Sequence, residues 1–120
     1  MRLAEIKATN MDLTGPIRDY VDEKLSNVAK LTEKFEPCDV RVEVGRTTMG
    51  QLKGDVFRCE LNLTIPGVML RSEVTKDDLY ASIDVAVGEL RRQVKDYKEK
   101  LRDADRVKMD TEIFEQDEEY

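Results

Sequence analysis

Residues 80–101, YASIDVAVGELRRQVKDYKEKL, form the stretch that decides the fold. Their apolar side chains recur at alternating intervals of three and four residues, which places them along one stripe of an α-helix. The members of this stripe are Tyr80, Ile83, Val87, Leu90, Val94, Tyr97 and Leu101. The pattern predicts an amphipathic helix that is capped by Asp77, ends near Arg102 and packs one face against the rest of the protein.

Basic residues are concentrated in the second half of the same helix. Residues 91–102 hold six basic and two acidic residues, a balance of +4, although the whole chain has a formal net charge of −6. The basic residues are Arg91, Arg92, Lys95, Lys98, Lys100 and Arg102. The i,i+4 pairs Arg92–Asp96 and Lys95–Glu99 can neutralise part of this charge. The excess of positive charge indicates an anionic partner. Nucleic acid fits, because clustered cations that pair with its phosphates release condensed counterions, which favours binding.

The remainder of the chain predicts four strands and one further helix. Alternation of apolar and polar residues predicts strands at 38–44, 57–65 and 68–75, and a weaker pattern predicts one at 2–9. The other helix begins at Thr14-Gly15-Pro16 and is expected to end at Glu36-Pro37, because the residue before proline avoids helical dihedrals. Pro66-Gly67 is a turn signal, and residues 45–54 are expected to form a glycine-containing loop.

The order β-α-β-β-β-α predicts an α+β fold, a two-layer sandwich with a four-stranded sheet and two helices on one face. If strands 38–44 and 57–65 form a hairpin, pairing Val44 with Phe57 brings Cys38 opposite Leu63. The two cysteines then do not oppose each other. We therefore expect Cys38 and Cys59 to be buried strand residues, and neither a disulfide nor zinc ligands.

Charge divides the chain into two parts. Residues 1–102 hold eighteen residues of each sign, whereas residues 103–120 hold eight acidic and two basic ones. We expect one domain over 1–102, followed by an acidic, disordered tail over 103–120. The chain shows neither a signal-peptide pattern nor an apolar run of ~20 residues, so we expect a cytoplasmic protein with no membrane partner.

The composition disfavours an enzyme. The chain contains no histidine, so general acid–base chemistry would depend on carboxylates, Lys, Tyr or Cys. Asp77-Asp78 is explained by helix capping, and Gly45, Gly50 and Gly54 lack the lysine pattern of a phosphate-binding loop. Neither cysteine has a histidine partner that would activate a thiol. We expect no catalytic residue, no metal, no cofactor and no small-molecule substrate.

Several stretches resemble the family of ribosome hibernation-promoting factors, also called ribosome-associated inhibitors or ribosomal subunit interface proteins. They are DLTGPIRDYV at 12–21, LRSE at 70–73, DLYASID at 78–84, LRRQV at 90–94 and KEK at 98–100. The order and spacing match over about residues 1–102. The resemblance implies a shape like that of the double-stranded-RNA-binding domain. It also implies a non-enzymatic bacterial factor that binds ribosomal RNA of the small subunit in the tRNA–mRNA channel near the decoding region. Such a factor keeps idle ribosomes inactive under stress or in stationary phase.

The resemblance also implies which residues contact RNA. Arg92, Lys98 and Lys100 match basic residues of the family's last helix that face ribosomal RNA, and Arg18 matches an arginine of its first helix. Helical periodicity adds Arg91, Lys95 and Arg102 to this face. Tyr80, Ile83 and Leu90 match core positions. The predicted RNA-binding set is therefore Arg18, Arg91, Arg92, Lys95, Lys98, Lys100 and Arg102.

The chain departs from the family pattern in charge and extent. Its net charge is acidic, and Asp96 and Tyr97 stand where a basic residue and a histidine are often seen. The second domain of the family's long form is absent, which leaves open whether the chain is a short form or a fragment. A second hypothesis also remains open: a protein-interaction module whose basic helix docks an acidic protein partner, with the tail regulating access.

Overall fold

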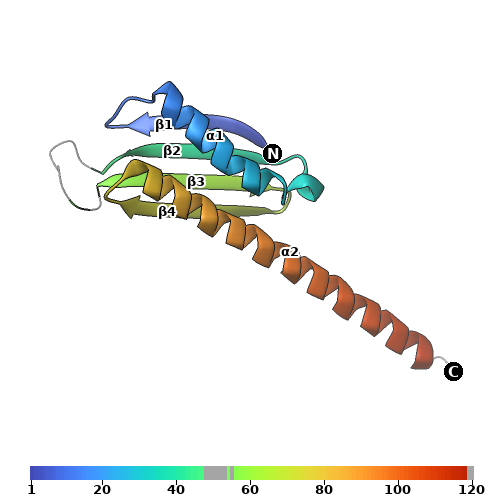
Figure 1. The fold of residues 1–120 in the computed structure, drawn as a ribbon. Helices are drawn as coiled ribbons and strands as arrows, with labels where there is room; N and C mark the ends of the chain where they lie inside the picture. The colour runs from blue at the N-terminus through green and yellow to red at the C-terminus, as the bar shows by residue number, and fades with distance from the viewer. Residues whose placement is uncertain (48–53, 55, 119–120) are drawn as a thin grey trace.

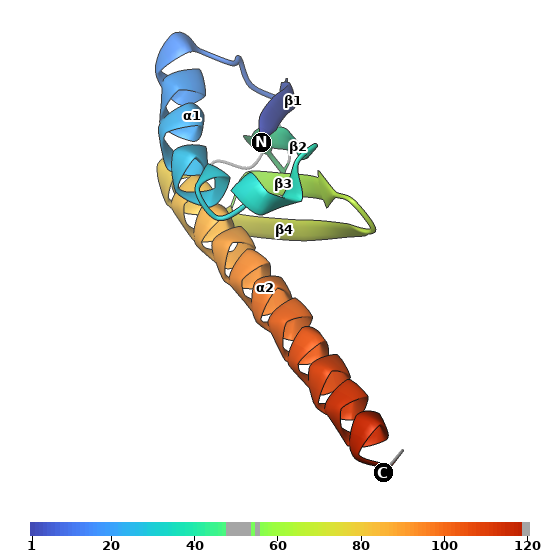
Figure 2. The same cartoon turned by 90° about the vertical axis from the view of Figure 1, so that its right-hand side faces the viewer.

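The computed structural model describes residues 1–47, 54 and 56–118, with side chains described as far as residue 105. The elements are β1 (Arg2–Thr9), α1 (Gly15–Ala29), the short 3-10 helix η1 (Glu33–Phe35), β2 (Asp39–Arg46), β3 (Phe57–Ile65), β4 (Val68–Lys76) and α2 (Leu79–Glu118). The strands form one sheet in the order β1-β2-β3-β4, in which β1 is parallel to β2 and the other pairs are antiparallel. Both helices cover the same face of this sheet (Figures 1 and 2). The predicted α+β sandwich is confirmed.

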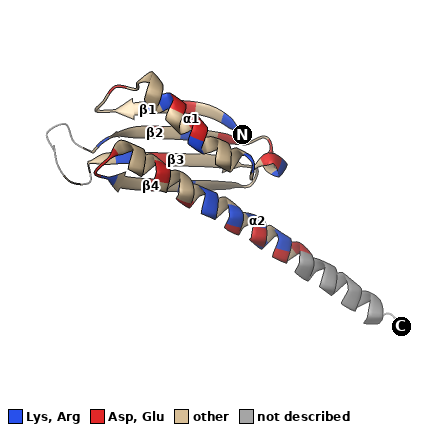
Figure 3. Cartoon of the chain, in the orientation of Figure 1, with Lys and Arg blue, Asp and Glu red and all other residues tan. Residues whose placement is uncertain are grey.

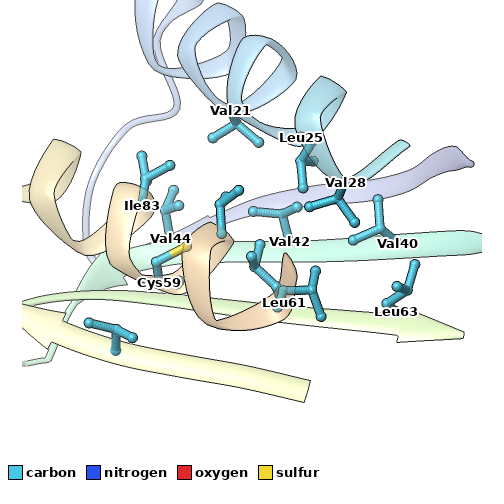
Figure 4. Close-up of a cluster of buried hydrophobic side chains, with 14 of the residues drawn as sticks. Val21, Leu25, Val28, Val40, Val42, Val44, Cys59, Leu61, Leu63 and Ile83 are labelled. Carbon is cyan, nitrogen blue, oxygen red and sulfur yellow. The ribbon is translucent and has the colours of Figure 1, made fainter. Parts of the chain in front are cut away.

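The hydrophobic core lies between the sheet and the two helices (Figure 4). Strands β2 and β3 turn alternate side chains toward the helices, and α1 and α2 each contribute one apolar stripe. Fully buried members include Val21 and Val28 of α1, Val40 and Val44 of β2, Leu61 and Leu63 of β3, and Ile83, Leu90 and Val94 of α2. Burying each such side chain contributes roughly 1.5–3 kcal/mol. The core therefore fixes which face of α2 is left for solvent.

The predicted register between β2 and β3 was wrong by two residues. Val44 lies opposite Cys59 rather than Phe57, and Val40 lies opposite Leu63. The cause is that β2 continues to Arg46, which makes the connection to β3 shorter than expected. A shift of two keeps the same side chains on the inner face, so the core is as predicted. Cys38 and Cys59 are both free and buried, as expected.

Two glycines determine local backbone paths. Gly67 has a φ of 87° in the two-residue turn between β3 and β4, which confirms the Pro66-Gly67 signal. Gly45 belongs to β2 and not to the expected loop. A Cβ atom at position 45 would overlap the carbonyl oxygen of Thr9, so the lack of a side chain lets β1 approach β2. Residues 48–53 of the expected loop, and residue 55 after it, lie outside the described part of the chain.

Helix α1 begins where the sequence predicts but ends early. The Ile17 amide donates to the Thr14 hydroxyl at 3.4 Å, so Thr14 is the N-cap. The helix stops at Ala29 instead of reaching Glu36. The buried Thr32 turns its hydroxyl back to the Ala29 carbonyl at 3.1 Å, a side-chain bond that competes with helix continuation. The segment 30–35 therefore becomes a turn followed by η1.

Helix α2 differs from the prediction at both ends. The Ala81 amide donates to the Asp78 carboxylate at 3.0 Å, so Asp78 and not Asp77 caps the helix. The helix continues past Arg102 to Glu118 (Figure 1), because no glycine or proline follows Gly88 to stop it. Side chains beyond residue 105 lie outside the described part of the chain. The division into a domain over 1–102 and a tail over 103–120 stays a prediction.

The apolar stripe of α2 is buried only in part. Ile83 and Leu90 are fully buried, as expected, but Tyr80 and Leu101 are 38% and 40% exposed. Leu79 and Ala86 take buried places that the periodic stripe did not include. The Tyr80 ring instead meets the Tyr20 ring of α1 edge to face, with centroids 4.7 Å apart. The assignment of Tyr80 to the core was wrong.

Candidate nucleic-acid interface

Four cations of α2 lie along one side of the helix. At about 100° per residue, Arg91, Lys95, Lys98 and Arg102 fall within an arc of about 60°. We call these four residues the cationic face. Asp84 lies in the same arc and forms an ion pair with Lys24 of α1, with Nζ and Oδ1 3.5 Å apart. The cationic face is therefore directed to the side of α2 on which α1 lies. Figure 3 shows Lys and Arg gathered in the middle of α2.

Three of the four residues of the cationic face line a surface groove of about 500 Å³. Lys95, Lys98 and Arg102 approach it from α2, and Lys34 of η1 approaches from the opposite wall. Leu31, Phe35 and Leu101 provide an apolar lining, and Glu99 and Asp105 are its two carboxylates. Four cations against two carboxylates leave the groove positively charged. We call this the cationic groove.

A smaller hollow of about 340 Å³ lies where α1 and α2 pass each other. It is lined by Lys24, Asn27, Asp84, Val87, Gly88 and Arg91. The Tyr20 hydroxyl donates to Asp84 at 2.5 Å, and this hydrogen bond raises the pKa of Tyr20 to about 12. Because Tyr20 and Lys24 already occupy the Asp84 carboxylate, the charge of Arg91 at the rim of the hollow is left uncompensated.

The cations of the face have no ionic partner among the side chains that the structure describes. Among the residues whose side chains are described, no ion pair involves Arg91, Lys95, Lys98 or Arg102. The pairs that helical spacing allows, Arg92–Asp96 and Lys95–Glu99, are likewise not among the ion pairs of that part of the chain. These side chains are therefore available to an external anion.

Three residues of the predicted set belong neither to the cationic face nor to the cationic groove. Around α2, Arg92 lies roughly 60° and Lys100 roughly 140° from the nearest member of the cationic face. Lys100 is on the side of Gln93, whose amide donates to the Arg71 carbonyl of β4 at 2.8 Å. Arg18 is exposed on α1 and lines neither hollow.

Two cations beside the cationic face were missed by the sequence analysis. Lys34 and Lys24 both come from the first half of the chain, and they reach the face only because α1 and η1 pack beside α2. Neither residue belongs to a periodic basic pattern, so the sequence gives no signal for them. Their placement depends on the tertiary arrangement.

The open face of the sheet carries charge in a different arrangement. Strand register aligns Glu43, Glu60 and Glu73 in one row across β2, β3 and β4. Arg58 pairs with all three carboxylates, with its Nε 2.9 Å from Glu73 and its Nη1 3.2 Å from Glu43. Arg71 pairs with Glu60 and Glu73. We call these five residues the sheet network.

The sheet network favours the charged form of two of its carboxylates, Glu60 and Glu73. The hydrogen bond from Asn62, with help from Arg71 and Arg58, lowers the pKa of Glu60. The hydrogen bond from Arg58 lowers the pKa of Glu73 in the same way. Three carboxylates surround two guanidinium groups in this network, so it offers little to an external anion.

Metal and membrane sites are not found where the structure can be described. Among the described residues, no group of three or more His, Cys, Asp or Glu side chains is placed to hold a metal ion. In the same part of the chain, no helix is both long and apolar enough to cross a bilayer.

Comparisons with known proteins agree on one family. The family model described as sigma 54 modulation protein / S30EA ribosomal protein matches residues 4–102. A ribosome hibernation promotion factor of Staphylococcus aureus is 34% identical over 110 residues, which cover 92% of this chain and 55% of that protein. The factor of the same name from Deinococcus radiodurans is 32% identical over 98 residues, 82% of this chain and 50% of the relative. The chain thus spans about half the length of these relatives.

Solved structures show the same fold. The crystal structure of the Thermus thermophilus Protein Y N-terminal domain is 33% identical, with a TM-score of 0.61 over 81% of this chain and 99% of that one. A ribosomal subunit interface protein from Coxiella burnetii is 19% identical, with a TM-score of 0.62 over 82% of this chain and 98% of that one. The second likeness supports the fold alone.

Proposed function

The chain belongs to the family of sigma 54 modulation proteins and S30EA ribosomal proteins, and from this premise we propose that it is a ribosome hibernation factor. It binds ribosomal RNA of the small subunit in the channel used by tRNA and mRNA, near the decoding region. There it keeps idle ribosomes inactive under stress, acting in the cytoplasm and without catalysis. The names of its relatives support hibernation, and the chemistry of α2 supports contact with RNA.

The observation that carries the RNA contact is the cationic face, whose four residues form no ion pair with any side chain up to residue 105. Phosphates that approach Arg91, Lys95, Lys98 and Arg102 do not have to displace a carboxylate first, so pairing releases counterions at little cost. The residues stand on a helix whose other side is fully buried at Leu90 and Val94, which fixes the backbone positions from which they project. Such a rigid row recognises the backbone of a folded RNA by shape and charge rather than by base sequence. A protein held in this way excludes tRNA and mRNA from the same channel.

The test compares two double variants. One reverses the charge of two cations in the groove, and the other reverses the charge of two cations on the same helix outside the groove. K95E/K98E should lose co-sedimentation with purified ribosomes in a sucrose gradient and should no longer inhibit translation in vitro. R92E/K100E changes the net charge by the same amount on the same helix but away from the groove, and it should retain most binding. Circular dichroism should be unchanged for both, because all four side chains lie outside the buried core.

Each outcome has a defined meaning. Undiminished co-sedimentation of K95E/K98E would refute RNA contact through this face. Loss of binding in both variants would favour the wider set that includes Arg92 and Lys100, as matched from the family.

An acidic protein partner remains the second candidate, because the apolar lining of the cationic groove could also hold a peptide. Ribonuclease treatment separates the two: a complex recovered from lysate that survives digestion of RNA supports the protein partner.

A further inference from the structure

The apolar lining of the cationic groove has no role in phosphate binding. Leu31, Phe35 and Leu101 stand between the cations, and Leu101 is 40% exposed although it belongs to the apolar stripe of α2. The Phe35 ring is held by the Tyr97 ring, with centroids 5.6 Å apart and planes inclined by 58°. Backbone phosphates gain nothing from such a surface. An apolar lining beside four cations fits a ligand that has both an apolar and an anionic part.

A nucleotide has this combination, because its base presents apolar faces and its phosphates carry the charge. The groove volume of about 500 Å³ lies in the range of small-molecule sites. Bases within a duplex are stacked on each other and cannot reach a side-chain floor, whereas unpaired bases are bound on aromatic and apolar side chains. The smaller hollow beside Arg91 has no aromatic residue in its lining, so the cationic groove is the better site for a base.

We propose that the cationic groove binds an unpaired nucleotide of RNA. Its base lies against Leu31, Phe35 and Leu101, and its flanking phosphates pair with Lys34, Lys95, Lys98 and Arg102. This inference rests on the proposed function and adds that the protein prefers single-stranded to double-stranded segments at this position. The rest of the cationic face, at Arg91, then follows the backbone.

The experiment compares two probes of equal charge. A fluorescein-labelled hexa-adenylate RNA and a hexamer of abasic riboses carry the same phosphates but differ in their bases. Fluorescence anisotropy at low salt should give about tenfold or tighter binding of the RNA, the effect of one base on an apolar and aromatic floor. L101S should remove this preference and leave the affinity for the abasic hexamer unchanged, because Leu101 touches only the base.

Further measurements distinguish a lost base contact from a change in folding. The methyl NMR signals of Leu101 should shift with hexa-adenylate and not with the abasic hexamer, as expected for a base ring placed next to them. F35L keeps an apolar floor without the aromatic ring and should retain part of the preference. K95E/K98E should weaken both probes alike, because it removes phosphate partners and not base contacts.

Equal binding of the two hexamers would overturn the inference, while ribosome co-sedimentation would still judge the proposed function separately. Failure of hexa-adenylate to bind a protein that co-sediments with ribosomes would also overturn it, since recognition would then need only a folded backbone. Binding of hexa-glutamate as tight as that of hexa-adenylate would overturn it in favour of an acidic peptide as the occupant.

Discussion

The sheet network and the cationic face use the same residue types in opposite ways. On the open sheet face, Arg58 and Arg71 are paired with Glu43, Glu60 and Glu73, so both cations already have ionic partners. On α2, four cations follow one side of the helix, and among the described side chains none of them forms an ion pair with Asp96 or Glu99. The number of cations on a surface therefore does not decide whether that surface attracts an anion. What decides it is whether each cation already has an ionic partner within the protein.

The two regions differ because their backbones repeat differently. In a sheet, an outward side chain has neighbours on two flanking strands, so residues distant in sequence surround it. On a helix, the neighbours are residues three and four positions away, so the order of charges along the chain sets each face. The sheet therefore neutralises its cations through register, and α2 keeps them available through spacing.

Added salt should act most strongly on the cationic groove. If four phosphates are bound, raising the salt from 50 to 200 mM should weaken RNA binding about 50- to 150-fold. Over the same range, the free energy of unfolding should change by less than about 1 kcal/mol, because surface ion pairs contribute little. Anisotropy titrations and urea unfolding at each salt concentration measure the two responses. A binding affinity that does not depend on salt would contradict phosphate contact altogether.

Removal of Arg58 should affect the sheet and spare the groove. R58M leaves Glu43, Glu60 and Glu73 adjacent without their shared partner, and we expect a loss of about 1 kcal/mol in unfolding free energy, allowing for solvent screening. The side chain of Arg71 is more exposed than that of Arg58, 54% against 25%, so R71M should cost less. Urea midpoints measure both effects. RNA affinity should stay within about twofold, and a larger loss would mean that the two regions are coupled.

Acid should also weaken the sheet network, with a smaller loss in unfolding free energy than the removal of Arg58 causes. The pKa values of Glu60 and Glu73 are lowered in the folded state, so the unfolded chain binds more protons at mildly acidic pH. The stabilisation is complete above the ordinary glutamate pKa of 4.5 and is lost as the pH falls through the lowered values. Urea midpoints between pH 6 and pH 3 should fall less steeply for E60Q/E73Q than for the unchanged protein. Parallel curves would show that the network does not stabilise the fold.

The elements of the fold could be predicted because each one follows a simple period. Alternation located β3 and β4, and the steps of three and four located α2. The β2–β3 register was wrong because the length of the connection depends on how far β2 continues, and alternation continues equally well in either register. The early end of α1 was missed because the hydroxyl of Thr32 competes for a backbone carbonyl, which periodicity does not include.

The candidate site was predictable only along α2. Helical spacing alone places Lys95, Lys98 and Arg102 together, and the structure brings them to one groove. Arg92 and Lys100 were added by matching positions in a linear pattern, and such matching does not say which way a side chain points. Lys34 and the floor residue Phe35 reach the groove through the packing of η1 beside α2, which no local pattern encodes.

A single helix supplies both part of the core and the row of cations. Leu90 and Val94 are fully buried, and Arg91 and Lys95 follow them directly in the chain. The backbone entropy lost in aligning these cations is therefore lost when the protein folds, before any RNA is present. An unstructured basic peptide of the same composition would have to lose that entropy on every encounter, and its affinity per contact would be lower.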